Sequence, residues 1–344
     1  MMHGDFIGGF FAFEAQTARA ATASGVLASW QGARPASLFG NARSALAALI
    51  AHSRPRKVWM PAFACHALVE AVPAEQLAWY AVGDTLTPDT AALARRVQPG
   101  DMLLGINYFG YGPDPDFLAF STAHDDLVLV EDCAHSLAPD APWGHWRLFS
   151  PRKLFGVADG GVLVQCRGDG AMPVATRPAA TPWQSWQACM LRFEDHDGTR
   201  NAEWFAANQA HEAQMSVNDQ GMTQLSRHLL ANLDPAPWIA RRRENHAVLA
   251  AQLARWQLPL PGRHSQAPFA FVLQLDPALR FSVLAQLHAE GIFAAVHWRN
   301  LPSPAADFAA EHRLAASLIS LPCDHRYDAD DMHRVACRVR ELLE

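Results

Sequence analysis

The segment FSPRKLFGVADGG, residues 149–161, places one lysine between an apolar run and a pair of glycines. Taken alone, Lys153 is either an ordinary cation in a surface turn or a buried amine with a covalent role. A buried lysine amine loses its proton easily and can then attack a carbonyl carbon to form a Schiff base. An acid and a histidine, Asp132 and His135, precede it in the segment LVLVEDCAHS. The chain therefore carries an amine, a carboxylate and an imidazole in one short stretch.

These groups match the needs of pyridoxal 5'-phosphate (PLP), which requires a lysine, a carboxylate beside its ring nitrogen and a cradle for its phosphate. Asp132 can be the carboxylate, because an ionised acid at the end of an apolar run is costly unless a cation meets it. The segment FGNARSAL (39–46) can be the cradle, since N–H groups at a helix start attract phosphate. Plainer roles stay open: Asp132 or Ser44 as a helix cap, and His135 as a structural histidine.

Short apolar runs that are typical of strands alternate with helical patterns from about residue 40 to 166. The expected strands lie at 57–63, 77–82, 102–109, 127–132, 146–150 and 161–166, with helices at 43–53, 65–74 and 114–124. Strands that are apolar at consecutive positions are covered on both faces, which predicts a large, doubly wound, mostly parallel α/β sheet. Ligands bind at the carboxyl ends of such strands, so the polar segments that follow four of them should converge on one pocket.

The pattern changes after Cys166. Residues 183–255 are helical in character, 268–275 predict a strand, 281–292 a helix, and 328–344 a terminal helix that Asp328 or Asp330 could cap. We therefore expect a large domain over residues 1–245 and a small C-terminal α+β domain over 246–344.

Composition excludes several other classes of protein. The 344 residues are 50% hydrophobic and carry a net charge of −6, which gives no electrostatic support for binding nucleic acid or a membrane surface. The six cysteines form no CxxC pair, and the acidic stretches at 124–126 and 194–198 lack the ligand spacing of zinc or calcium sites. No apolar run approaches the roughly 20 residues that span a bilayer. We expect a soluble, globular, cytoplasmic protein without a bound metal.

Four segments carry a family resemblance: VWMPAFACHALVEAV, LVEDCAHSL, SPRKLFGVADGGVLV and LPCDHRYDADDMHRVA. They resemble the DegT/DnrJ/StrS group of PLP-dependent sugar aminotransferases, and matching segments run from about residue 39 to the C-terminus. The resemblance implies the aspartate aminotransferase fold, called fold type I, with a seven-stranded type of sheet in the large domain and a small C-terminal domain. It also implies a homodimer with active sites near the subunit interface.

The resemblance also implies roles for individual residues. Lys153 falls on the Schiff-base lysine, Asp132 on the partner of the pyridinium nitrogen, and His135 where the family has a Gln or His near the phenolic oxygen of the cofactor.

The phosphate site of the family falls on three further positions. Arg43 and Ser44 stand where a Gly-Thr pair usually binds phosphate, and Ser150 lies near a serine that contacts phosphate. The spacing from Ser150 to the lysine is two residues shorter than in the family.

The chain departs from the family pattern at three places. Cys65 stands where an aromatic residue usually stacks on the cofactor ring, and Phe63 or Phe109 could substitute for it. A histidine of the family aligns with Asn107 or Tyr108. The loop that the neighbouring subunit usually contributes has its closest counterpart at 218–226.

The predicted function is that of a PLP-dependent aminotransferase. It would move an amino group from an amino acid, expected to be glutamate, to a keto-sugar that could be nucleotide-linked, in polysaccharide or natural-product biosynthesis. Two alternatives stay open: a PLP enzyme of the same fold acting on a non-sugar carbonyl, and a catalytically silent member serving as a binding or regulatory subunit.

Overall fold

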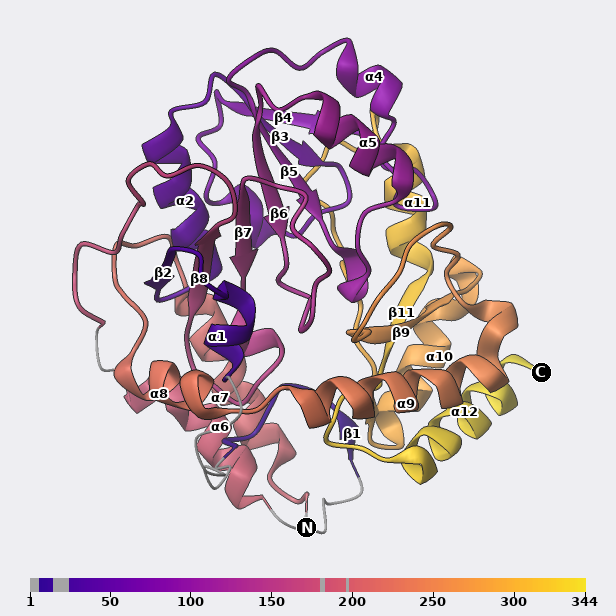
Figure 1. The fold of residues 1–344 in the computed structure, drawn as a ribbon. Coiled ribbons are helices and arrows are strands. Elements are labelled where there is room, and N and C mark those ends of the chain that lie inside the picture. The colour runs from indigo at the N-terminus through magenta and orange to yellow at the C-terminus, as the bar shows by residue number, and fades with distance from the viewer. Residues whose placement is uncertain (1–5, 15–24, 180–182, 196–197) are drawn as a thin grey trace.

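The computed structural model describes residues 6–14, 25–179, 183–195 and 198–344. Its central feature is a seven-stranded sheet in the order β2-β8-β7-β6-β5-β3-β4 (Figure 1). The strands are β2 (Ala36–Phe39), β3 (Val58–Pro61), β4 (Leu77–Tyr80), β5 (Met102–Ile106), β6 (Val128–Asp132), β7 (Trp146–Phe149) and β8 (Gly161–Gln165). The pairs are parallel except where β8 meets β2 and β7. This confirms the predicted α/β class with a large, mostly parallel sheet.

Helices pack on both faces of the sheet, as the apolar strands predicted. Alternate residues of β8 show the two faces: Leu163 belongs to a core cluster with α2 (Ala42–Ser53), whereas Val162 and Val164 belong to another with α1 (Val26–Gln31). Each strand is buried on both sides because its side chains alternate between these two cores.

Three shorter helices follow strands β3, β4 and β5. They are α3 (His66–Val69), α4 (Thr90–Ala94) and α5 (Pro115–Ala123). The helix predicted over 65–74 is reduced to the four residues of α3, and Pro73 disfavours helical backbone in the residue before it. Three more helices, α6 (Trp183–Glu194), α7 (Asn201–Gln214) and α8 (Gln224–Asn232), lie at the opposite end of the molecule (Figure 1).

The C-terminal region forms a second core. Its strands β9 (Ala270–Gln274) and β11 (Leu318–Pro322) pair antiparallel, and α9 (Ala236–Leu253), α10 (Pro277–Ala289), α11 (Ala309–Ser317) and α12 (Ala329–Leu343) pack around them (Figure 1). Asp328 caps α12 in a capping box with Asp331, which confirms Asp328 as the cap. This region combines strands and helices as the sequence predicted.

The N-terminal segment also joins this second core. The two-residue strand β1 (Ile7–Gly8) pairs in parallel with β10 (Ile292–Phe293), and Ile7 is buried in the same cluster as α12. The expected domain boundary at 245/246 falls within α9, whose last turns pack in the C-terminal core. The division into two domains at that residue stays a prediction.

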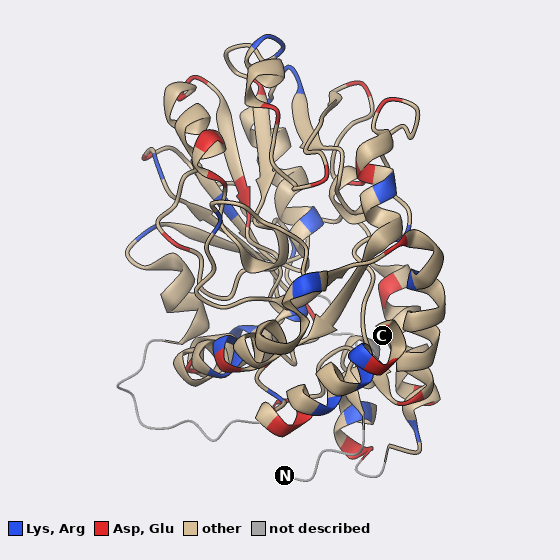
Figure 2. Ribbon diagram, turned by 90° about the vertical axis from the view of Figure 1, so that its right-hand side faces the viewer, with Lys and Arg blue, Asp and Glu red and all other residues tan. Residues whose placement is uncertain are grey.

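Charged residues are distributed without a block of one sign along the ribbon in the view of Figure 2. Within the described ranges no helix combines the length and the apolar character that a membrane span needs. The same described residues contain no group of three His, Cys, Asp or Glu side chains placed to hold a metal ion, although the stretch 194–198 falls partly outside them.

Candidate active site

A cavity of about 640 Å³, counting its open mouth, lies where strands β3, β5, β6 and β7 end. The segments that follow β3, β6 and β7 contribute to its wall, as the position of ligand sites in α/β sheets predicts. Strand β5 contributes its own last residue, Ile106, whereas the polar segment that follows it does not line the cavity. Six of the eight site residues predicted from the sequence line the cavity: Arg43, Cys65, Asp132, His135, Ser150 and Lys153. The other two, Ser44 and Phe63, are buried and do not line the cavity.

Asp132 faces the cavity, whereas its neighbour Glu131 faces the other side of β6. Glu131 accepts two hydrogen bonds from the Arg147 guanidinium, at 2.9 and 3.1 Å, and one from the Asn107 amide at 2.8 Å. The Asp132 carboxylate accepts one bond from the backbone N–H of Ala134, at 2.9 Å. Successive side chains of a strand point to opposite faces, which separates the two acids.

Burial raises the pKa of Asp132, although the nearby Lys153 charge and the Ala134 amide act to lower it. A buried carboxylate with so few partners is poorly compensated when it is ionised. The cavity side of Asp132 is therefore suited to a ligand group that carries a positive charge.

His135 and Lys153 lie in contact in the cavity. Lys153 Nζ is 3.3 Å from His135 Nε2, and the His135 ring stacks on Phe269 with centroids 4.3 Å apart. The pKa of His135 lies well below its usual value because of burial, the Lys153 charge and the neighbouring His297. The Nδ1 atom of His135 is buried, and it has no hydrogen-bond partner among the residues that the structure describes. A neutral imidazole with one free nitrogen can receive or donate a hydrogen bond to a ligand beside Lys153.

The turn that carries Lys153 is short, and buried side chains follow it directly. Pro151 opens a single 3-10 turn that ends at Lys153, whose N–H donates to the carbonyl of Ser150 at 3.1 Å. The next two side chains, Leu154 and Phe155, are fully buried. These anchors leave the Lys153 amine as the part of the turn that reaches the cavity.

The glycine pair after the lysine lets β8 approach the start of α2. Gly160 has a φ of +135°, and its N–H donates to the carbonyl of Gly40 at 2.8 Å. A Cβ on Gly161 would lie 2.3 Å from the carbonyl oxygen of Asn41. A side chain at Gly161 would push β8 away from the α2 start, and one at Gly160 would meet Pro151 at the start of the lysine turn. The Gly-Gly motif therefore lets the lysine turn and the predicted phosphate cradle lie side by side.

The N-terminus of α2 forms one end of the cavity. Asn41 caps the helix by accepting from the Ser44 N–H at 2.8 Å, while Asn41, Ala42 and Arg43 line the cavity. The first N–H groups of a helix lack carbonyl partners within it, so this end can receive an anion. The Ser44 hydroxyl is turned away and accepts from the N–H of Asn218 at 3.0 Å. Ser44 therefore serves the helix cap, and its hydroxyl joins the loop beyond the cavity wall.

These features agree with a family model. Residues 26–340 match the DegT/DnrJ/EryC1/StrS aminotransferase family. The chain belongs to this family. The match covers most of the chain and confirms the family resemblance and the predicted enzyme class.

Solved structures with the same fold are distant in sequence. The Streptococcus pneumoniae protein Spr1654 in its PLP form has a TM-score of 0.68 at 15% identity, over 98% of this chain and 100% of that one. DesI, solved in the presence of its TDP-sugar product, has a TM-score of 0.63 at 21% identity, over 91% and 82%. NtdA from Bacillus subtilis, with bound PMP, has a TM-score of 0.63 at 12% identity, over 92% and 75%. Comparison with curated proteins gives no match.

The aromatic residue at the cavity differs from the sequence-based expectation. Cys65 lines the wall, and Phe63 is completely buried behind it. Trp298 lines the cavity instead, with its ring 5.9 Å from that of His135 and 5.5 Å from that of Phe63. Trp298 comes from the segment after β10, so in this aminotransferase the C-terminal region supplies an aromatic wall.

Two further lining residues also escaped the sequence analysis. Arg152 lines the cavity and is paired with the partly exposed carboxylate of Glu212. Met215 lines the cavity, and its carbonyl accepts from the Arg43 guanidinium at 2.9 Å. Arg152 stands beside Lys153 in the sequence, so its adjacency was a usable signal. Met215 offered none, because the loop that carries it comes from a distant part of the chain.

The loop that resembles the family's inter-subunit loop, 218–226, lies against the α2 start of its own chain. The Gly40 N–H donates to the carbonyl of Gln220 at 2.8 Å. Asp159, just before the glycine pair, accepts from the Thr223 N–H and hydroxyl, both at 2.7 Å. The loop therefore borders the predicted phosphate cradle and is tied to the segment that carries Lys153.

Proposed function

We propose that this family member is a PLP-dependent aminotransferase that moves an amino group from an amino acid, with glutamate as the expected donor, to a keto-sugar. The observation that carries the proposal is that Lys153, His135 and the buried Asp132 share one cavity with the free end of α2. The PLP and PMP forms of Spr1654 and the PMP-bound NtdA support the choice of cofactor.

The residues present fit PLP by three independent features. Asp132 is a buried acid that lacks a strong cationic partner, which suits a protonated ring nitrogen. His135 has a buried, unpartnered nitrogen, which suits a polar ring substituent. The first residues of α2 line one end of the cavity, and a helix start suits a phosphate. When bound, PLP supplies an aldehyde that condenses with amines and a ring that takes up carbanion charge.

The residues would then divide the work. Lys153 Nζ would hold the cofactor and, when released, carry a proton between a substrate carbon and the cofactor. Asp132 would keep a proton on the ring nitrogen, and His135 would orient the ring and accept or donate one hydrogen bond. Arg43 and Arg152 are paired with partly exposed acids, so an anionic ligand group could displace those weakly held partners.

The acceptor is proposed to be a keto-sugar, free or in a nucleotide-linked form, because the family match is supported by DesI, which was solved with its TDP-sugar product. On the basis of the family resemblance, we also propose that the protein is a homodimer and that it works in the cytoplasm. A second candidate, a less polar non-sugar carbonyl, is favoured by the apolar part of the wall, where Cys65, Leu68, Ile106 and Trp298 lie.

Two experiments test the proposal. The purified protein incubated with PLP should absorb visible light as lysine-bound PLP does, and borohydride should fix the cofactor on Lys153, as read by peptide mass mapping. A Lys153→Ala variant is the control and should not be labelled. A colourless, unlabelled wild-type protein would overturn the proposal and favour a catalytically silent family member.

The acceptor is tested by turnover. With glutamate as donor, release of 2-oxoglutarate should depend on a keto-sugar or its nucleotide-linked form. Release that depends instead on simple ketones or aldehydes would favour the second candidate.

A further inference from the structure

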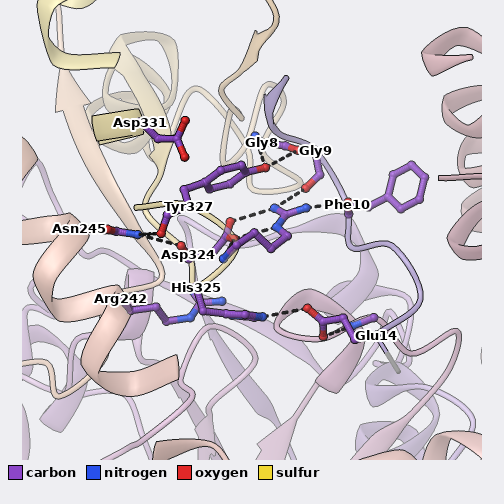
Figure 3. A network of polar contacts seen from close by, with 12 residues as sticks. Gly8, Gly9, Phe10, Glu14, Arg242, Asn245, Asp324, His325, Tyr327 and Asp331 are labelled. Carbon is purple, nitrogen blue, oxygen red and sulfur yellow. Dashed lines mark hydrogen bonds and ion pairs between the residues drawn. The ribbon is translucent and has the colours of Figure 1, made fainter. Parts of the chain in front are cut away.

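Residues 6–14, here called the N-terminal strap, are fixed to the C-terminal core at their first half. Tyr327, at the end of the segment after β11, binds both polar groups of Gly8: its hydroxyl accepts from the Gly8 N–H at 2.7 Å and lies 3.3 Å from the Gly8 carbonyl (Figure 3). The pairing of β1 with β10 holds the same residues from the other side.

Two arginines bind the next carbonyls of the strap. Arg326 donates to the Phe10 and Gly9 carbonyls at 3.0 and 3.1 Å, while Asp324 pairs with the same guanidinium at 2.7 Å. Arg192 donates to the carbonyls of Gly8, at 2.7 Å, and Phe10. Guanidinium groups present several donors in a rigid plane, so this part of the strap has one well-defined path.

The second half of the strap crosses the turn that carries Lys153. A Cβ on Gly156 would lie 1.9 Å from the carbonyl oxygen of Ala12, so the two backbones touch at this glycine. The Gly156 N–H donates to Oε2 of Glu14 at 3.1 Å. Glu14 therefore binds the backbone three residues after Lys153.

The other oxygen of Glu14 binds the C-terminal region. Glu14 Oε1 lies 2.8 Å from His325 Nε2 (Figure 3). The His325 ring is stacked between Trp238, at 4.1 Å, and Phe11, at 5.5 Å between centroids. Phe11 belongs to the strap, whereas Trp238 belongs to α9 and holds the ring from outside it. The carboxylate therefore joins a ring that is stacked on α9 to the segment just after Lys153.

We propose that Glu14 is a positioning residue for Lys153. Its carboxylate accepts from the Gly156 N–H, three residues beyond Lys153, and couples this segment to His325 in the C-terminal region. Hydrogen bonds to a charged acceptor are stronger than neutral ones, so loss of this carboxylate frees the backbone just beyond the lysine. A misplaced catalytic amine loses rate steeply with small displacements. The inference rests on the proposed role of Lys153.

Hydrogen exchange in the full-length, cofactor-free protein tests the coupling directly. Glu14→Ala should speed exchange of the amides at 154–158 by about tenfold or more, because the Gly156 bond is lost. Glu14→Gln can still accept from Gly156 through its amide oxygen, so its effect should be smaller. Tyr327→Phe is the matched control: it weakens the strap at Gly8 and should leave exchange at 154–158 unchanged.

The PLP-loaded protein gives the functional measurement. Glu14→Ala should slow the attachment of PLP to Lys153, followed by absorbance, and should lower kcat with little change in KM. Exchange at 154–158 that is equal in Glu14→Ala and wild type would overturn the proposal. An equal increase in Tyr327→Phe would also overturn it, since the strap would then act only on general stability. Absence of PLP on Lys153 in the wild type would instead refute the proposed function, and the exchange result would still decide the coupling.

Discussion

The two acids that end β6 have opposite environments. Glu131 lies in a closed network in which Arg147 and Asn107 donate three hydrogen bonds to its carboxylate. The Trp143 N–H and the Cys133 thiol donate two longer ones. Asp132 has one backbone N–H and the field of Lys153 across a cavity. Both side chains are almost completely buried. Burial therefore does not distinguish the two acids. They differ in how many hydrogen bonds the protein donates to each carboxylate.

The difference indicates a division between structure and chemistry within one dipeptide. Where a buried charge has all of its partners within the protein, removal of one partner strongly destabilises the native state, because the other charge is left buried and unpaired. A buried charge that the protein leaves poorly paired destabilises the ligand-free state and is compensated when a suitable ligand binds. Four predictions test whether the two faces of β6 separate in this way.

The largest effect is expected on catalysis, from removal of the Lys153 amine on the cavity side of the sheet. Lys153→Ala should lower kcat by about 10⁴-fold, since a positioned acid–base group contributes about 10²–10⁴-fold and the covalent hold on PLP is lost as well. The midpoint of thermal unfolding of the cofactor-free variant should stay close to that of the wild type. Turnover above one per cent of wild type would show that another group does this work.

The second effect is expected on stability, from removal of the Glu131 carboxylate on the other face of β6. Glu131→Ala should lower the free energy of unfolding by about 3–5 kcal/mol, because Arg147 is left buried without its acid. Denaturant unfolding measures this change, and Glu131→Gln, which keeps some hydrogen bonds, serves as the milder comparison. If the variant unfolds like the wild type, the network around Arg147 contributes nothing and the comparison fails.

The third effect returns to the cavity. Asp132→Asn should reduce kcat by about 100-fold, since a hydrogen bond to a charged group is worth about 1.5–3 kcal/mol and each 1.36 kcal/mol changes the rate tenfold. The cofactor-free protein should be as stable as the wild type at neutral pH or more stable. Near-normal turnover would remove Asp132 from the proposed mechanism, and a large loss of stability would place it with Glu131.

The smallest effect is a dependence of stability on pH. Because burial raises the pKa of Asp132 in the folded, cofactor-free protein, its contribution favours folding below the unfolded pKa of about 3.9. That contribution is lost as the pH rises through the higher folded pKa, by about 1.4 kcal/mol for each pH unit that separates the folded and unfolded pKa values. The wild type should therefore lose stability relative to Asp132→Asn over this range. A constant difference between the two unfolding curves would mean that the Asp132 pKa is the same in both states.

Much of the fold follows from local patterns. The apolar runs 127–132 and 146–150 predicted β6 and β7 to within one residue at each end, because strands buried on both faces are recognisable without their neighbours. The strand β2 was not predicted, since it is a four-residue edge strand with only alternate residues buried. The short β1 and β10 were missed because two residues carry no pattern of their own.

The candidate site was predictable to a similar extent. Lys153 and His135, together with Asp132, were found from residue type and order, and the structure brings them to one cavity. Phe63 and Phe109 were named as possible replacements for the stacking aromatic, yet the structure buries both and places Trp298 at the cavity. The choice depends on how the segment after β10 folds back, which no short stretch of sequence records.

By itself, the sequence determined that Asp132 ends one strand, with His135 just after it, and that Lys153 follows the next strand. Hence it determined that an amine, an acid and an imidazole would meet at the edge of the sheet. Strand periodicity and the glycine pair encode this within a few residues. Only the tertiary structure decided that Glu14 would reach both the lysine turn and His325, and that Trp298 would close the wall. Those contacts join segments more than 100 residues apart, 142 for Gly156 with Glu14 and 311 for His325 with Glu14, so no local pattern of the sequence encodes them.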